Sequence, residues 1–189
     1  MKKLKKMVAV LLTAIMAMAM SVSVFASTQT GTLKVKVNDK NTLENQTIKV
    51  YKLFDLSRSG ENYAYTVNSE YEAILKQVLN ITKDDATSDD YYKALSSMTK
   101  DSEKIQSFAN DFTKAAITAK KAETAKKENL AKGTTEVSFD NLAYGYYLVY
   151  QTGTKEIQSS LVSLDAAEKE VRKTRIAQTC ALLFHDVPR

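Results

Sequence analysis

The chain of 189 residues contains no tryptophan and only one cysteine, one histidine and one proline. A single cysteine cannot close a disulfide within the chain, so a disulfide-stabilised scaffold is excluded. A zinc site built from cysteine and histidine, or a Cys–His nucleophile, also lacks its residues. The apolar content of 44% and the charged content of 26% are those of an ordinary globular protein. The composition therefore predicts a globular domain that is stabilised by its apolar core.

Excess positive charge is confined to the N-terminus. The formal net charge is +5 at pH 7, and residues 1–26 contain four lysines and no acidic residue. The remainder has 23 basic and 22 acidic residues and is almost neutral. A nearly neutral body has no general attraction for nucleic acid, so we expect no nucleic-acid partner.

The first 26 residues have the three parts of a secretory signal peptide. Four lysines precede an apolar run over residues 7–20, and small residues lead to a cleavage site between Ala26 and Ser27. Cleavage there would release residues 27–189 from the membrane to the outside of the cell. A retained membrane anchor is the alternative, because residues 7–26 have the length of a bilayer span.

The start of the exported chain has the alternation of apolar and polar residues that is typical of strands. Residues 32–37 alternate strictly and predict a half-buried strand. Residues 46–56 are more apolar and predict a central strand in which Val50 and Phe54 share a face. Turn-forming residues follow, and residues 63–67 predict the second strand of a hairpin.

Over residues 69–132 the apolar residues recur at helical spacing. Ser69 and Glu72 have the spacing of a capping box and predict the start of a first helix. A second, short helix is predicted to begin near Ser88. These residues therefore predict a helical block between two groups of strands.

A third and longest helix is predicted to begin at Asp101, whose side chain can cap it. Its apolar residues fall on one stripe, while most of its lysines fall outside that stripe. Gly133 is a suitable helix stop. Glu123 and Lys127 would then form an i,i+4 ion pair on the helix surface.

Strand alternation returns after the helical block. Residues 134–139 and 144–150 predict two strands with a turn at Asp140 and Asn141 between them. Residues 160–164 predict another strand, which residues 168–171 would extend. About six strands with helices between the third and fourth predict an α+β fold. We interpret it as an antiparallel immunoglobulin-like β-sandwich with a helical insertion.

Three stretches carry a resemblance to a known family. They are TIKVYKLFDL (residues 47–56) with YAYTV (63–67), VSFDNLAYGYYLVY (137–150), and the serine-rich strand at 159–164. In this order, with helices between them, they resemble the N-terminal domain of Gram-positive isopeptide-forming fimbrial (pilin) subunits, which are assembled by sortase. The resemblance covers residues 30–171.

The resemblance implies an exported, non-enzymatic structural subunit of a cell-wall pilus. Such subunits have two or more sandwich domains, and a sortase joins their C-terminal LPxTG-type signal to a lysine of the next subunit. The implied partners are other pilin subunits and a pilus sortase, and for cell adhesion a host surface glycan or matrix protein. The alternative function is that of a free-standing secreted adhesin or binding module.

Residues 172–189 depart from this family. They contain no LPxTG motif and no C-terminal apolar segment with a basic tail. They have three arginines and one lysine, whereas residues 27–171 contain 18 lysines and one arginine. Cys180, His185 and the single proline also lie in this tail. We interpret the tail as translated out of frame or as following a truncation, so that the second domain is missing.

No residue pattern predicts catalysis, a cofactor or a metal. The only histidine, His185, lies in the anomalous tail. The acidic residues Asp84, Asp85, Asp89 and Asp90 lack the spacing of a calcium-binding loop. We interpret them as residues that favour a helix N-terminus.

Four further residues are candidates for bonds or contacts. Lys52 is the best placed lysine for an internal isopeptide bond, which requires a neutral and buried amine. A lysine whose stem lies along the surface is the simpler interpretation of Lys52. Tyr144, Tyr147 and Tyr150 are the tyrosines that we expect at the surface, where aromatic rings bind sugars or partner proteins.

Overall fold

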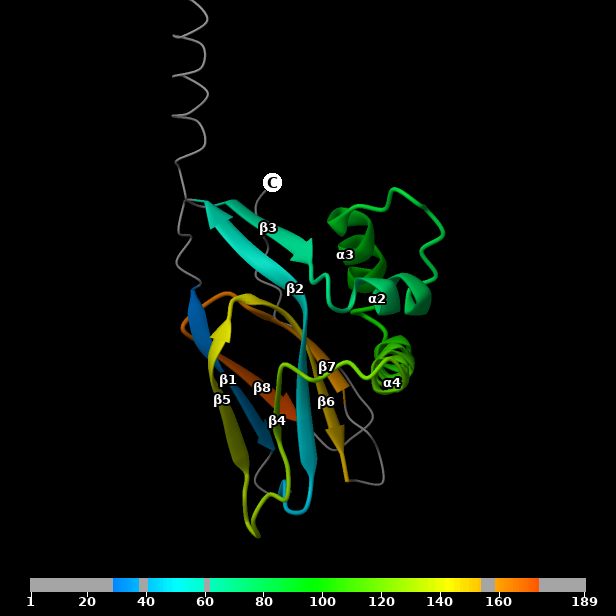
Figure 1. Cartoon of the computed structure of the whole chain (residues 1–189). Helices are drawn as coiled ribbons and strands as arrows, with labels where there is room; N and C mark the ends of the chain where they lie inside the picture. The colour runs from blue at the N-terminus through cyan, green and yellow to red at the C-terminus, as the bar shows by residue number, and fades with distance from the viewer. Residues whose placement is uncertain (1–28, 38–40, 60–61, 154–158, 174–189) are drawn as a thin grey trace, which may run out of the picture.

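A computed structural model describes residues 29–37, 41–59, 62–153 and 159–173 of the chain (Figure 1). The expected signal peptide, its cleavage site at Ala26 and Ser27, and tail residues 174–189 with Cys180 and His185 lie outside these ranges. The elements, in chain order, are β1 (Thr30–Val37), β2 (Thr47–Ser59), β3 (Asn62–Val67), α2 (Glu72–Val78), α3 (Ser88–Ser96), α4 (Ser102–Thr118), β4 (Ala125–Lys127), β5 (Glu136–Ala143), β6 (Gly145–Thr152), β7 (Ser159–Leu164) and β8 (Glu168–Lys173).

The described strands form two sheets. Sheet A has the order β5-β1-β8, and sheet B has the order β3-β2-β6-β7, with β4 also paired to β2. All pairings are antiparallel except that of β1 with β8, which is parallel. The prediction of an α+β fold is confirmed, and α2, α3 and α4 lie between β3 and β4 in chain order. The prediction of purely antiparallel sheets is wrong at the pairing of β1 with β8.

Apolar side chains from both sheets meet between the sheets and form an inter-sheet cluster. Its buried members are Leu33, Val35, Leu43, Ile48, Val50, Val137, Phe139, Leu142, Tyr147, Val149, Val162, Leu164 and Val171. The arrangement is that of a β-sandwich, in which alternate residues of each strand face the partner sheet.

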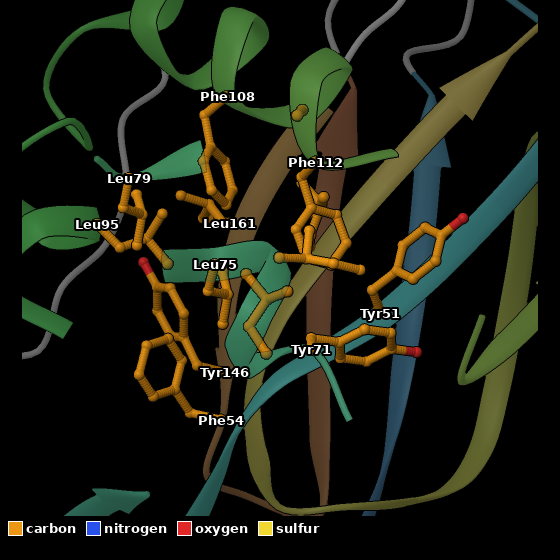
Figure 2. Packing of buried hydrophobic residues seen from close by; sticks show 14 of the residues in the cluster. Tyr51, Phe54, Tyr71, Leu75, Leu79, Leu95, Phe108, Phe112, Tyr146 and Leu161 are labelled. Carbon is orange, nitrogen blue, oxygen red and sulfur yellow. The ribbon is translucent and has the colours of Figure 1, made fainter. Parts of the chain in front are cut away.

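Helices α2, α3 and α4 cover the opposite face of sheet B (Figure 1). Phe108 and Phe112 of α4 pack there with Tyr51 and Phe54 of β2 and with Tyr146 of β6 (Figure 2). We call these side chains and their neighbours the helix-side cluster. Strands β2 and β6 are therefore buried on both faces, which explains why every residue of β6 but the last is buried.

A β-bulge changes which face of β2 the side chains occupy. The register between β2 and β6 shifts between Lys52 and Phe54. Val50 lies in the inter-sheet cluster, whereas Leu53 and Phe54 both lie in the helix-side cluster. The prediction that Phe54 shares a face with Val50 is wrong, because the bulge inserts one residue and reverses the alternation.

Helix starts are predicted well where a side chain caps the backbone. Asp101 accepts hydrogen bonds from two backbone N–H groups of α4, as predicted. The start of α3 near Ser88 is also confirmed, and Thr87 and Asp90 form its capping box. The capping box expected at Ser69 is wrong, because α2 begins at Glu72 without a side-chain cap.

Helix α4 ends at Thr118, well before Gly133. Lys120 adopts a left-handed backbone conformation with a φ of 54°, which stops the helix. Strand β4 then pairs with β2, so the predicted helical pair of Glu123 with Lys127 is wrong. Glu123 instead lies 3.6 Å from the ammonium of Lys126.

Two predictions about the last strands are also corrected. The turn expected at Asp140 and Asn141 is absent, because β5 continues through both residues. Asn141 has a φ of 57° and lies where the register of β5 against β1 shifts. Residues 168–171 do not extend the preceding strand but lie in β8, which crosses to the other sheet and runs to Lys173.

Candidate functional site

The first and last described strands, β1 and β8, lie side by side and parallel, and we call them the terminal strand pair. Six residues of each strand are in register, from Thr32 opposite Glu168 to Val37 opposite Lys173. Because the strands are parallel, β1 begins at one end of the pair and β8 ends at the other. The chain therefore enters and leaves the fold at opposite ends of the same two strands.

The inner face of the terminal strand pair is anchored in the inter-sheet cluster. Leu33 and Val35 of β1 are fully buried, and Val171 of β8 is 8% exposed. Complete burial of side chains of this size contributes about 1.5–3 kcal/mol each. These residues therefore hold both terminal strands on the core.

The outer face of sheet A is a ladder of opposite charges. The ammonium of Lys34 lies 2.8 Å from a carboxylate oxygen of Glu168, and that of Lys36 lies 2.9 Å from both Glu170 and Glu136. Hydrogen bonds to these glutamates raise the pKa of Lys34 and of Lys36. Opposite charges on adjacent strands favour this register over a slipped one.

Gly31 allows the turn before β8 to approach β1. A Cβ at Gly31 would lie 2.5 Å from the backbone oxygen of Ala166 and 3.1 Å from that of Ala167. The next amide, that of Thr32, donates a 2.8 Å hydrogen bond to the same oxygen of Ala167. A side chain at Gly31 would therefore displace the turn that leads into β8.

The tyrosines expected at the surface occupy other positions. Tyr147 is fully buried in the inter-sheet cluster, Tyr150 is only 9% exposed and lies in the helix-side cluster, and Tyr144 is half-buried. The prediction of exposure is wrong for Tyr147 and Tyr150, because both faces of β6 are covered. Burial raises the pKa of both side chains.

Lys52 fits the interpretation of a lysine lying along the surface. Its ammonium lies 2.6 Å from a carboxylate oxygen of Asp55, and its side chain is 19% exposed. Its methylenes lie against Gly145, where a Cβ would come within 3.1 Å of them. An amine that is ion-paired and reached by water is not the neutral, buried amine that an isopeptide bond requires.

The acidic residues in the first turn of α3 bind its N-cap residue and a nearby lysine. The carboxylate of Asp90 accepts hydrogen bonds from the N–H and hydroxyl of Thr87, which hold the pKa of Asp90 below its usual value. Asp89 lies 2.6 Å from Lys93.

Among the described residues, no group of histidine, cysteine, aspartate and glutamate side chains could hold a metal ion. In the same residues, no helix has the length and apolarity to cross a membrane.

No protein-family model and no curated protein matches this chain. The candidate site therefore depends on the geometry of the terminal strand pair. Sequence reasoning missed this pair because it assigned residues 168–171 to the preceding strand. The signal was present in the charges, since Lys34 and Lys36 match the spacing of Glu168 and Glu170.

Proposed function

We propose that this protein is a non-enzymatic structural domain of a Gram-positive cell-wall pilus. In this proposal sheets A and B form an immunoglobulin-like sandwich, and α2, α3 and α4 are an insertion on its side. The signal peptide would export the chain, and the proposed family is based on the resemblance over residues 30–171.

The observation that carries the proposal is the parallel pairing of β1 with β8. A domain within a fibre is pulled through its two ends. Here that tension would act along β1 and β8 in opposite directions, and it would load the hydrogen bonds and ion pairs of the terminal strand pair together. An antiparallel terminal pair would instead open one bond at a time from its end. The topology therefore suits a domain that carries load.

The helical layer supports the same role. Because helices cover one face of sheet B, the two central strands are packed on both sides. A sheet that is buried on both faces bends less easily than one with an open face, since any bend disturbs two close-packed layers. We therefore expect the domain to resist bending.

The test is polymerisation by a sortase. The open reading frame would be restored past codon 171, so that it continues into strand-patterned sequence and a sorting signal, and expressed with a pilus sortase. We expect a ladder of covalent multimers from the restored protein and none from the present chain. The proposal fails if neither alternative frame encodes such a segment, or if the restored protein stays monomeric. Monomers that bind a glycan or matrix protein saturably would instead favour the free-standing adhesin.

A further inference from the structure

Strands β2 and β3 form a hairpin that projects beyond the other strands of sheet B (Figure 1). The register of β2 with β6 ends at Asp55 opposite Gly145, whereas β2 continues to Ser59 beside β3. Among the described strands, β3 pairs only with β2, so its other side is an edge of the sheet. Ala64 and Thr66 of β3 are exposed. A further strand can therefore approach β3 where the hairpin leaves the body of the fold.

Two hydrogen bonds show which backbone groups of β3 point to this open edge. The amide of Asn68, directly after β3, donates a 2.9 Å hydrogen bond to a carbonyl oxygen of β2. The amide of Val67 points the other way and donates a 3.0 Å hydrogen bond to the hydroxyl of Ser88. Because an antiparallel strand alternates its backbone groups between its two sides, the N–H and C=O of Tyr63 and of Tyr65 also point outward. No described residue pairs with these four groups, so they are available to another strand.

Strand β3 lacks the features that normally protect an exposed edge. Such edges carry charged residues, proline or a bulge, which prevent another strand from pairing. β3 has the sequence NYAYTV and contains none of these, while most of its residues favour strands. The other edge strands of the described fold differ, because β4, β5 and β8 are charged and β7 has no exposed residue. The edge of β3 therefore favours pairing with another strand.

From these observations we infer that two copies of this protein pair their β3 strands in an antiparallel arrangement around a two-fold axis at Ala64. In this register Tyr63 of each copy lies opposite Tyr65 of the other, and all four outward groups of each strand form hydrogen bonds. A register shifted toward the end of β3 would place a strand against Val67, whose amide already binds Ser88. Because β3 has no charged residue, the axis brings no like charges of β3 together.

The side chains of β3 also fit a second copy. Tyr63 is 37% exposed and is one of two exposed large hydrophobic side chains among the described residues. In the proposed pair its ring would pack beside Tyr65 of the other copy, and aromatic pairs on adjacent strands stabilise a sheet. On the opposite face, the small side chain of Ala64 suits a position at which the two Cα atoms are about 4.5 Å apart. This association needs no sortase and does not depend on the proposed structural role.

The test is disulfide trapping in the purified full chain, with Cys180 replaced by serine so that no other thiol is present. At the proposed axis the two Cα atoms of residue 64 lie within the range of about 4.4–6.8 Å that a disulfide requires. We therefore expect Ala64→Cys to form a disulfide-linked dimer under mild oxidation. Thr66→Cys is the matched control, because Thr66 is exposed on the same face but its two copies would lie about 14 Å apart. The inference is overturned if Ala64→Cys stays monomeric, or if both variants cross-link equally.

Sedimentation measures the same association without a cross-link. We expect a reversible dimer of the wild type at protein concentrations up to about 1 mM, because one strand pair makes a small interface of the weak, transient class. Ala64→Lys places like charges opposite each other at the axis and should weaken the dimer at least about tenfold.

Ser57→Lys is the control with the same added charge. Ser57 lies opposite Ala64 on β2, one strand farther from the axis, so Ser57→Lys should weaken the dimer by less than about twofold. Circular dichroism should show that both lysine variants are folded, because both side chains are exposed. A wild type that stays monomeric at about 1 mM, or equal losses in the two folded variants, would overturn the inference.

Discussion

Substitution of Gly31 by alanine tests how the terminal strand pair is held. Where alanine fits, it stabilises a fold by about 0.4–1 kcal/mol relative to glycine, because it restricts the unfolded chain. Here the new methyl carbon would lie 2.5 Å from the oxygen of Ala166, which belongs to the backbone and cannot rotate away. Overpacking of this kind costs about 1–3 kcal/mol. We therefore expect Gly31→Ala to lower the free energy of unfolding by about 2 kcal/mol.

Urea unfolding, followed by tyrosine fluorescence because the chain has no tryptophan, measures this change. With a slope of about 1–3 kcal/mol per molar urea, the midpoint should fall by about 1 M. The amide of Thr32, which donates to Ala167, should also exchange its hydrogen faster. Thr30→Ala is the control, because Thr30 is exposed in the same strand and should change stability by less than about 0.5 kcal/mol. A Gly31→Ala protein as stable as this control, with unchanged exchange at Thr32, would refute the reasoning.

The remaining predictions concern tyrosines in and against the helix-side cluster. The hydroxyl of Tyr146 is buried and has no hydrogen-bond partner in the described part of the chain, so Tyr146→Phe should leave the free energy of unfolding unchanged or raise it by up to about 1 kcal/mol. By contrast, the hydroxyl of Tyr65 lies 2.7 Å from that of Ser163, so Tyr65→Phe should lower the free energy of unfolding by about 1 kcal/mol. In urea unfolding, a loss for Tyr146→Phe as large as the loss for Tyr65→Phe would contradict this contrast. Burial raises the pKa of Tyr51 and of Tyr65 to about 12, so the fold favours their neutral forms. The resulting stability is fully present below about pH 10 and is lost as the pH rises to about 12. Tyrosinate absorbance should therefore rise together with loss of the circular dichroism signal. Ionisation of Tyr51 and Tyr65 near pH 10 in a protein that is still folded would contradict the burial of their side chains.

Much of the fold follows from the periodicity of the sequence. Two patterns locate an element correctly, namely the strict alternation around Val35 and the helical spacing after Asp101. They do so because one face of each element is buried and the other is exposed to solvent. A cap such as Asp101 is visible in the sequence because its partners are the next few amides.

Other features depend on contacts between distant segments and could not be predicted. Phe54 changes face because of a bulge, and a bulge leaves no mark on the composition of the strand. Tyr147 and Tyr150 are both buried because a helical layer covers the second face of β6. The sequence of the strand itself does not indicate that helices cover this face. The parallel pairing of β8 joins Val171 to Val35, which lie far apart in the chain.

The most direct test of a load-bearing role is the force that unfolds the domain when it is pulled along different directions. Cysteines at positions 30 and 173, with Cys180 replaced by serine, would anchor the chain so that β1 and β8 are sheared. Anchors at positions 30 and 143 would pull from the adjacent ends of β1 and β5, where Thr30 lies opposite Ala143, and would open those antiparallel strands one pair at a time. Forced unfolding reports the height of the unfolding barrier along each direction. The terminal strand pair predicts an unfolding force several times higher for the first pair of anchors, whereas equal forces, or a lower force for the first pair, would contradict it.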